Sequence, residues 1–217
     1  MKIEISRKTK ETDIQLTLSQ IELKVNDEQA TPTNEVANVP LNLNTNQIEI
    51  LSNGAPAVES IGLFSHFLNA FLFYAGLNVE LKVAGDLWVD AHHTIEDIGI
   101  CLGQAFRKLY LEIGSFERFS ECLLPMDEAL VRSALDISGR PFLYMGGFES
   151  NTLSNIEQSY LEFWNAFVRE SRVCLHVDVL RGTNRHHMFE GVYKSVGRCI
   201  KRALVTQTNI QSTKGVI

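Results

Sequence analysis

The chain has 217 residues and a formal charge of −6, and its shares of hydrophobic (45%) and charged (21%) residues are those of an ordinary globular domain or two fused small halves. It has no block of five Lys and Arg residues, no apolar run of 18 residues and no hydrophobic N-terminal signal region, which argues against nucleic-acid binding, membrane binding and secretion. Its four cysteines form no CxxC pair, so we expect free thiols in a cytoplasmic protein rather than disulfides or a zinc site.

The chain begins with two strand candidates and then becomes polar. Alternating apolar and polar residues predict strands over residues 3–7 and 13–25. Residues 26–60 contain few large apolar side chains. We expect this stretch to be an insertion, either a mobile loop or an extended hairpin that uses residues 47–51.

A helix, a strand and a histidine motif complete the first half. The segment LFSHFLNAFLFYAG, from Leu63, has helical periodicity, and NVELKVAGDLWVD, from Asn78, reads as a strand. DAHHTIEDIGICLGQAFRKL, from Asp90, contains two histidines and a glutamate in the pattern HHxxE. The apolar spacing after this pattern predicts a second helix that begins at the motif.

The second half repeats this order. Two strand candidates, residues 129–136 and 141–148, are expected to pair with each other, and SYLEFWNAFVRES, from Ser159, has helical periodicity. The segment RVCLHVDVLRG, from Arg172, reads as a strand, and NRHHMFEGVYKSVGRCIKRAL, from Asn184, contains HHxxE again. The two motifs lie a little under half the chain apart, which indicates a duplicated half rather than short repeats.

The duplication predicts the fold class. Each half reads strand–strand–helix–strand–helix, so we expect an α+β protein whose helices cover one face of a mixed sheet. The predicted halves are residues 1–114, which include the insertion, and residues 115–217.

The spacing within HHxxE predicts metal binding. Residues i and i+4 of a helix share a face, so the first histidine and the glutamate of each motif can bind one ion. The second histidine points about 100° away, and it can serve the other ion if the halves face each other across a pseudo-twofold axis. The predicted groups are His92, Glu96 and His187 for one ion and His186, Glu190 and His93 for the other.

The earlier helix of each half offers one more ligand. His66 and Glu162 lie at nearly equal distances before the two motifs. Imidazole and carboxylate ligands without thiolate favour manganese, iron or zinc over a structural zinc cage. His176, on a strand, is expected to be structural. The alternative is that the motifs are surface helix starts, with Glu96 and Glu190 favoured by the helix dipole.

These segments resemble a known family. DAHHTIEDIGICLGQAF, PMDEALVRSALDISGRPF and HVDVLRGTNRHHMFEGVYKSVGRCIKRAL, with RKTKET and STKG near the two ends, are similar to imidazoleglycerol-phosphate dehydratase. The resemblance implies two duplicated ferredoxin-like half-domains, each with a four-stranded sheet and two helices on one face. It also implies two Mn²⁺ ions per site, a large homo-oligomer, typically of 24 subunits, and active sites between subunits.

The resemblance also implies the reaction and its carboxylates. The family removes water from imidazole glycerol phosphate to give imidazole acetol phosphate in histidine biosynthesis, with the metals as Lewis acids. Proton transfer needs a positioned carboxylate, for which Glu11 of RKTKET is the first candidate and Asp127 of PMDEAL the second. The alternative for Asp127 and Glu128 is a charge at the end of a helix or strand.

The substrate phosphate requires cationic or hydroxyl donors. Arginine suits bidentate phosphate contacts and lysine supplies a point charge. By resemblance these donors are Arg118, Arg140, Lys194, Ser212 and Lys214. With Glu11, His66, His92, His93, Glu96 and His186 they form the predicted substrate-binding set.

Two residues depart from the family pattern. The family's first helix usually carries an aspartate where this chain has Ser65, and its second-half helix usually supplies a histidine ligand where this chain has Glu162. A glutamate can bind manganese but adds negative charge. Two alternatives therefore stay open, a paralogue that acts on another imidazole or phosphorylated substrate and a catalytically silent metal-binding scaffold.

Overall fold

The computed structural model describes residues 1–20, 46–52, 59–148, 152–209 and 212, in eight strands and four α-helices. The first half contains β1 (Lys2–Lys8), β2 (Thr12–Gln20), β3 (Gln47–Ser52), α1 (Glu59–Ala75), β4 (Leu77–Gly85) and α2 (His92–Ile113). The second half contains β5 (Phe119–Met126), β6 (Ala129–Asp136), β7 (Phe142–Gly146), α3 (Asn155–Ser171), β8 (Cys174–Arg181) and α4 (Arg185–Ala203). None of the described helices is long and apolar enough to span a membrane.

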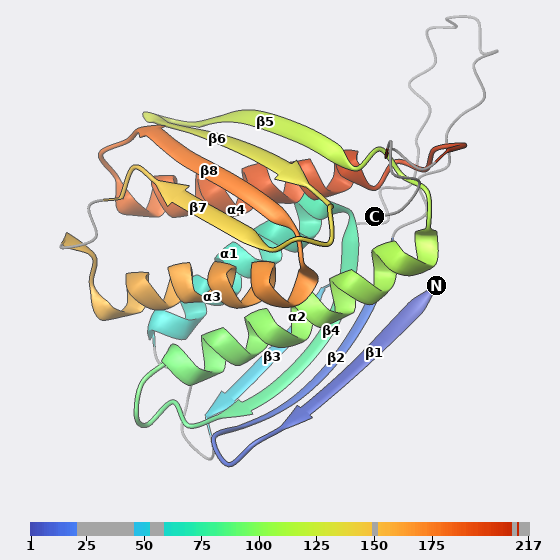
Figure 1. Cartoon of the computed structure of the whole chain (residues 1–217). Coiled ribbons are helices and arrows are strands. Elements are labelled where there is room, and N and C mark those ends of the chain that lie inside the picture. Colours follow the sequence, from blue (N-terminus) through green and yellow to red (C-terminus); the bar gives the residue numbers. More distant parts are fainter. Residues whose placement is uncertain (21–45, 53–58, 149–151, 210–211, 213–217) are drawn as a thin grey trace, which may run out of the picture.

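The two sheets have the same topology. Their strand orders are β1-β2-β4-β3 and β5-β6-β8-β7, with antiparallel pairs except for the parallel pairs β3–β4 and β7–β8. The four helices lie between the sheets, and each sheet has its helices on one face (Figure 1). The predicted α+β fold, with two duplicated ferredoxin-like halves, is confirmed.

The strand β3 corrects the predicted insertion. Gln47–Ser52 is a regular strand that pairs in parallel with β4, as β7 does with β8, and it forms no hairpin with any residue that the structure describes. Each half therefore has three strands before its first helix, and the symmetry is broken over a shorter stretch than predicted. Residues 26–45 of the expected insertion lie outside the described part of the chain. A six-residue strand with a single sheet neighbour carries too short an alternation to stand out from polar flanks.

The second half contains a strand that the sequence analysis did not predict. Phe119–Met126 forms β5, an edge strand, where Pro125 is tolerated because one side of an edge strand needs no ladder hydrogen bonds. The predicted strands at 129–136 and 141–148 exist as β6 and β7, but their expected pairing is wrong. β7 pairs in parallel with β8. The helix α3 connects these two strands in the sequence and supplies the long crossover that a parallel pair requires.

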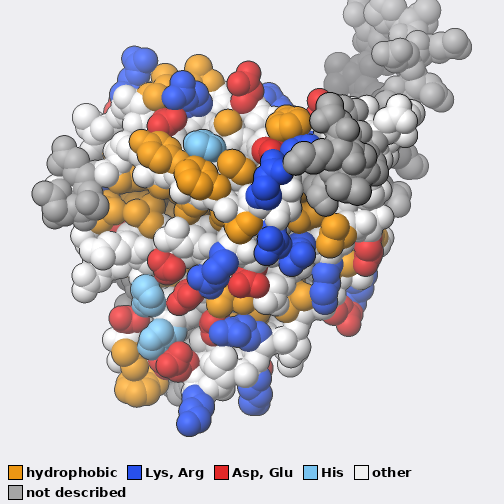
Figure 2. Space-filling view, viewed as in Figure 1, with side chains coloured by type: hydrophobic (Ala, Val, Ile, Leu, Met, Phe, Trp, Pro, Cys, Tyr) orange, Lys and Arg blue, Asp and Glu red, His pale blue; other side chains and the backbone are white. Residues whose placement is uncertain are grey.

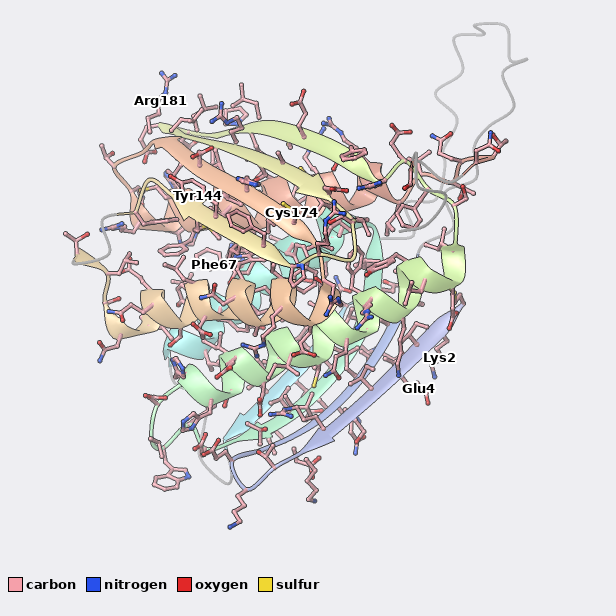
Figure 3. The ribbon with its side chains drawn as sticks, viewed as in Figure 1. Lys2, Glu4, Phe67, Tyr144, Cys174 and Arg181 are labelled. Atoms are coloured by element: carbon pink, nitrogen blue, oxygen red, sulfur yellow. The ribbon has the colours of Figure 1, made fainter. Side chains whose placement is uncertain are left out.

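The hydrophobic core joins the two halves. The helix α1 packs against α4 and α2 packs against α3, so each helix has its main helical neighbour in the other half. Glycines allow these close approaches. A Cβ at Gly103 would lie 2.6 Å from the Phe167 carbonyl oxygen, and one at Gly197 would lie 2.5 Å from that of Phe71. Phe67 lies fully buried between the sheets, and its ring centroid is 5.3 Å from that of His186 (Figure 3).

The outward faces of the two sheets differ. The first is polar, and Lys2 and Glu4 point away from it and form an ion pair of 3.1 Å (Figure 3). Hydrophobic side chains gather over the second sheet (Figure 2). Its large exposed apolar residues are Phe119, Leu123, Phe142, Tyr144 and Leu180. Exposed apolar surface of this kind usually marks an interaction site.

Candidate active site

The helices α1 and α4 bring three potential metal ligands together. One ligand atom from each of His66, His186 and Glu190 lies within 4.8 Å of the other two. His186 Nε2 is 3.1 Å from Glu190 Oε2, and His66 Nε2 is 3.7 Å from Glu190 Oε1. This is the only such group of three among the residues that the structure describes. His66 of the first half therefore joins the motif of the second half.

The carboxylate of Glu190 is buried but charged. Burial acts to raise its pKa, while the hydrogen bond from Lys194 and the nearby His66 and His186 lower it, and the pKa ends below its ordinary value. Lys194 Nζ lies 2.7 Å from Glu190 Oε1, so this predicted substrate-binding residue stands beside the ligand cluster. A charged carboxylate between two imidazoles fits a manganese, iron or zinc ion.

The corresponding group on α2 and α3 is more open. His92 Nε2 is 4.0 Å from Glu96 Oε2, and Arg169 Nη2 approaches the other Glu96 oxygen to 3.5 Å. Glu162 lines a depression of about 530 Å³ together with His92, and its Oε2 accepts a hydrogen bond from Asn165 on its own helix. Ligation by Glu162 stays a prediction.

The second histidine of each motif faces a carboxylate of its own half. His93 Nδ1 lies 2.9 Å from Asp86 Oδ2, and His187 Nδ1 lies 2.7 Å from Glu128 Oε2. These hydrogen bonds raise the pKa of both histidines. The expected exchange of His93 and His187 between the two motifs does not occur within one chain.

Both candidate catalytic carboxylates lie on hairpin turns next to these histidines. Glu11, in the β1–β2 turn, has Oε2 3.9 Å from His93 Nδ1. Asp127, in the β5–β6 turn, has Oδ2 3.6 Å from His187 Nε2 and a left-handed backbone with φ of 49°. Each of the two hairpin turns thus presents an exposed candidate carboxylate beside a histidine, and the catalytic roles stay predictions.

A buried aspartate anchors the first of these turns. Asp97 Oδ1 accepts a hydrogen bond of 2.9 Å from Arg7 Nε, and Asp97 Oδ2 accepts one from the Thr12 hydroxyl. The hydrogen bond with Asp97 also raises the pKa of Arg7. Arg7 and Thr12 flank the turn that carries Glu11, so α2 fixes this turn. Sequence analysis missed both Asp97 and Asp86; an acid inside the apolar pattern after HHxxE was the available signal for Asp97.

Comparison with known proteins decides the family. The sequence profile of imidazoleglycerol-phosphate dehydratase matches residues 60–200. Over 217 aligned residues, the chain is 37% identical to the imidazoleglycerol-phosphate dehydratase of Caldicellulosiruptor bescii, with 99% of this chain and 97% of that protein covered. The chain belongs to the imidazoleglycerol-phosphate dehydratase family.

Solved structures of the imidazoleglycerol-phosphate dehydratase family share the fold. The Staphylococcus aureus enzyme has a TM-score of 0.69 at 26% identity, with 95% of this chain and 100% of that chain covered. The Pyrococcus furiosus enzyme, in complex with (S)-C348, has a TM-score of 0.71 at 28% identity, with 98% and 100% covered. The resemblance stated from the sequence is therefore confirmed for family and fold.

The arginines expected to bind phosphate in this dehydratase lie at the end of β6 opposite to Glu128 and its partner His187. Arg118 Nε is 2.7 Å from Asp136 Oδ1, and Arg140 Nη2 is 4.0 Å from Asp136 Oδ2. Asp136 ends β6, whereas Glu128 directly precedes this strand, so eight residue steps along the strand separate them by roughly 26 Å. Ser212 is half-buried, and Lys214 lies outside the described residues. One chain therefore does not gather all predicted substrate-binding residues.

Proposed function

We propose that this hydro-lyase of histidine biosynthesis converts imidazole glycerol phosphate to imidazole acetol phosphate with two Mn²⁺ ions per site. Family membership supports the reaction class. The observation that carries the metal assignment is the group of His66, His186 and Glu190, whose ligand atoms converge within 4.8 Å. Mn²⁺ bound there would supply Lewis acidity toward the substrate's imidazole ring.

Some of the predicted ligands bind an ion within their own chain, and others complete the coordination of an ion bound by another copy. His66, His186 and Glu190 hold one ion. We assign His92 and Glu96, with Glu162 as third ligand, to the other ion, because His92 and Glu162 line one depression. His93 and His187 complete ions held by other copies of the chain, because neither of them joins a group of three ligands among the described residues of its own chain.

Proton transfer falls to the exposed carboxylates on the hairpin turns. The Glu11 side chain is 55% exposed and lies beside His93, so it can reach a substrate bound at the histidines. A carboxylate placed in this way can take the proton from the carbon next to the imidazole ring and return it later. Asp127 has the same relation to His187 and is the second candidate.

The separation of the cations from the metal ligands supports a site shared between chains. Arg118, Arg140, Ser212 and Lys214 would bind the phosphate of a substrate whose ring lies on the metal ligands of another copy. The apolar outer face of the second sheet supports self-association into the large homo-oligomer, a 24-mer, implied by the resemblance. The four unpaired cysteines support a cytoplasmic location, because disulfides persist in oxidising compartments.

The deciding experiment measures turnover of imidazole glycerol phosphate by purified protein that is stripped of metal and reloaded with Mn²⁺. We expect imidazole acetol phosphate to form only after reloading. Absence of turnover, despite stoichiometric Mn²⁺ binding and an assembled oligomer, would overturn the substrate assignment and favour a paralogue with another substrate. Light scattering of the same samples measures the size of the assembly.

A further inference from the structure

The second histidine of each motif is held through the same ring nitrogen. Asp86 Oδ2 lies 2.9 Å from Nδ1 of His93, and Glu128 Oε2 lies 2.7 Å from Nδ1 of His187. The first histidine of each motif behaves differently, because its Nε2 is directed toward the glutamate four residues later. Within each motif, the first histidine therefore contacts the glutamate of its own helix through Nε2. The second histidine contacts a carboxylate outside the helix through Nδ1.

The two holding carboxylates come from positions that the duplication does not relate. Glu128 directly precedes β6, and the residue that directly precedes the matching strand β2 is Glu11. Asp86 instead follows β4, in a connection to the helix that is longer than the corresponding one after β8. That shorter connection, residues 182–184, contains no acid. The same contact therefore arises in two different ways, which indicates that the contact matters beyond inheritance from the duplicated half.

Burial restrains one of the two holding carboxylates, and backbone hydrogen bonds fix the other. Asp86 is buried, with 7% of its surface exposed. Glu128 Oε1 accepts hydrogen bonds from the backbone N–H groups of Thr183 at 3.1 Å and Asn184 at 2.8 Å, directly before α4. The two backbone donors hold one oxygen of Glu128 and leave the other, Oε2, beside His187 Nδ1.

We propose that Asp86 and Glu128 are positioning residues, which accept the Nδ1 proton of His93 and His187 and so present Nε2 of each ring to a metal ion. A carboxylate behind a metal-binding histidine fixes both its tautomer and its ring orientation. The rings can be reached, since the side chains of His93 and His187 are 37% and 24% exposed. The inference rests on the metal site of the proposed function.

The assignment explains why the first half needs Asp86. Glu11 occupies the position that Glu128 has in the second half, but it stays 3.9 Å from His93 Nδ1 and exposed. Because Asp86 holds the ring, Glu11 is left for proton transfer. In the second half Glu128 holds the ring, and the neighbouring Asp127 is the exposed carboxylate. Each half therefore has one carboxylate that holds the histidine ring and one that is left for proton transfer.

The test uses the full-length, metal-stripped protein, Mn²⁺ titration followed by electron paramagnetic resonance, and crystal structures of the variants. Glu128→Ala removes the acceptor, and we expect Mn²⁺ affinity at the site of His187 to fall roughly 10-fold to 100-fold, with the ring of His187 reoriented. Glu128→Gln keeps a neutral acceptor, and we expect a smaller loss. The control Glu121→Ala removes an exposed glutamate of the same half and should bind Mn²⁺ like the wild type.

Asp86→Asn supplies the same test in the first half, with an expected loss of affinity of about tenfold. If Asp86→Asn fails to fold, the Mn²⁺ affinities and ring orientations of the Glu128 variants decide whether the inference holds. Mn²⁺ affinity of Glu128→Ala within twofold of wild type, with an unchanged His187 ring, would overturn the inference. Its failure differs from failure of the proposed function, because metal affinity and ring orientation are read without substrate, whereas the function is read from turnover.

Discussion

The α1–α4 and α2–α3 ligand groups begin from the same HHxxE motif but differ in structure. On α4, Glu190 is buried, and two histidines and a lysine surround it. On α2, Glu96 is more exposed, 4.0 Å from its histidine and contacted by Arg169. The difference comes from the facing helix, which supplies His66 in one case and Glu162 in the other. The motif thus supplies the histidine and the glutamate of each group. The residue on the facing helix determines whether a third ligand lies close to them.

Removing the buried glutamate, Glu190, should lower turnover more than any other substitution considered below. We expect Glu190→Gln to lower turnover about 1000-fold or more, because Lewis-acid stabilisation is worth several kcal/mol and the amide is a poor ligand. Glu96→Gln should lower turnover less, by roughly 100-fold, because its group is less closely assembled. Steady-state kinetics with Mn²⁺ titration measures both. Equal losses in the two variants would contradict the difference between the groups.

Substitutions of the hairpin carboxylates should lower the rate of proton transfer without changing Mn²⁺ binding. Glu11→Gln is expected to lower kcat about 100-fold or more while Mn²⁺ affinity stays unchanged, because only proton transfer is removed. Asp127→Asn carries the same change in the other half, and comparison of the two kcat values identifies the turn that acts on the substrate. A loss of Mn²⁺ binding in Glu11→Gln would contradict its assignment to proton transfer.

A histidine at position 162 would make the α2–α3 ligand group resemble the α1–α4 group. Glu162→His gives α3 the residue type that α1 has at His66, and we expect Mn²⁺ affinity at the α2–α3 site to rise roughly tenfold as net negative charge falls. Isothermal titration of metal-stripped protein measures this. Gln158→His is the matched control, since it adds a histidine one turn earlier on the same depression. An equal gain in the control, or none in Glu162→His, would place Glu162 outside the ligand set.

The smallest expected effect is on the pH dependence of the metal-free protein. The carboxylates beside His93 and His187 raise the pKa of both rings above 6.5. A raised folded-state pKa stabilises the fold below the unfolded pKa, and this stability is lost as pH rises through the folded value. We therefore expect the melting temperature to fall by at most a few degrees above pH 6.5. Glu128→Gln should remove the part due to His187, and an identical profile would contradict it.

Much of the molecule could be predicted from the sequence because its signals are local. The spacing of His186 and Glu190 within one helix predicts their convergence, and the repeat predicts two similar halves. The sequence offered β3 only as one of two alternatives, and it missed β5, whose pattern contains a single buried residue where β1 has two in alternation. The pairing of His66 with Glu190, and of Asp97 with Arg7, depends on contacts between segments far apart in the chain, which no local pattern encodes.

The packing of each helix on a helix of the other half bears on the origin of the chain. A single ancestral half would have exposed the helical surface that Gly103 and Gly197 now bring against Phe167 and Phe71. Such a half could bury this surface only by pairing with a second copy of itself. Gene fusion would then have turned an encounter between two molecules into an intramolecular one, at a high effective concentration. Two fused copies can differ in sequence, as His66 in one half and Glu162 in the other illustrate.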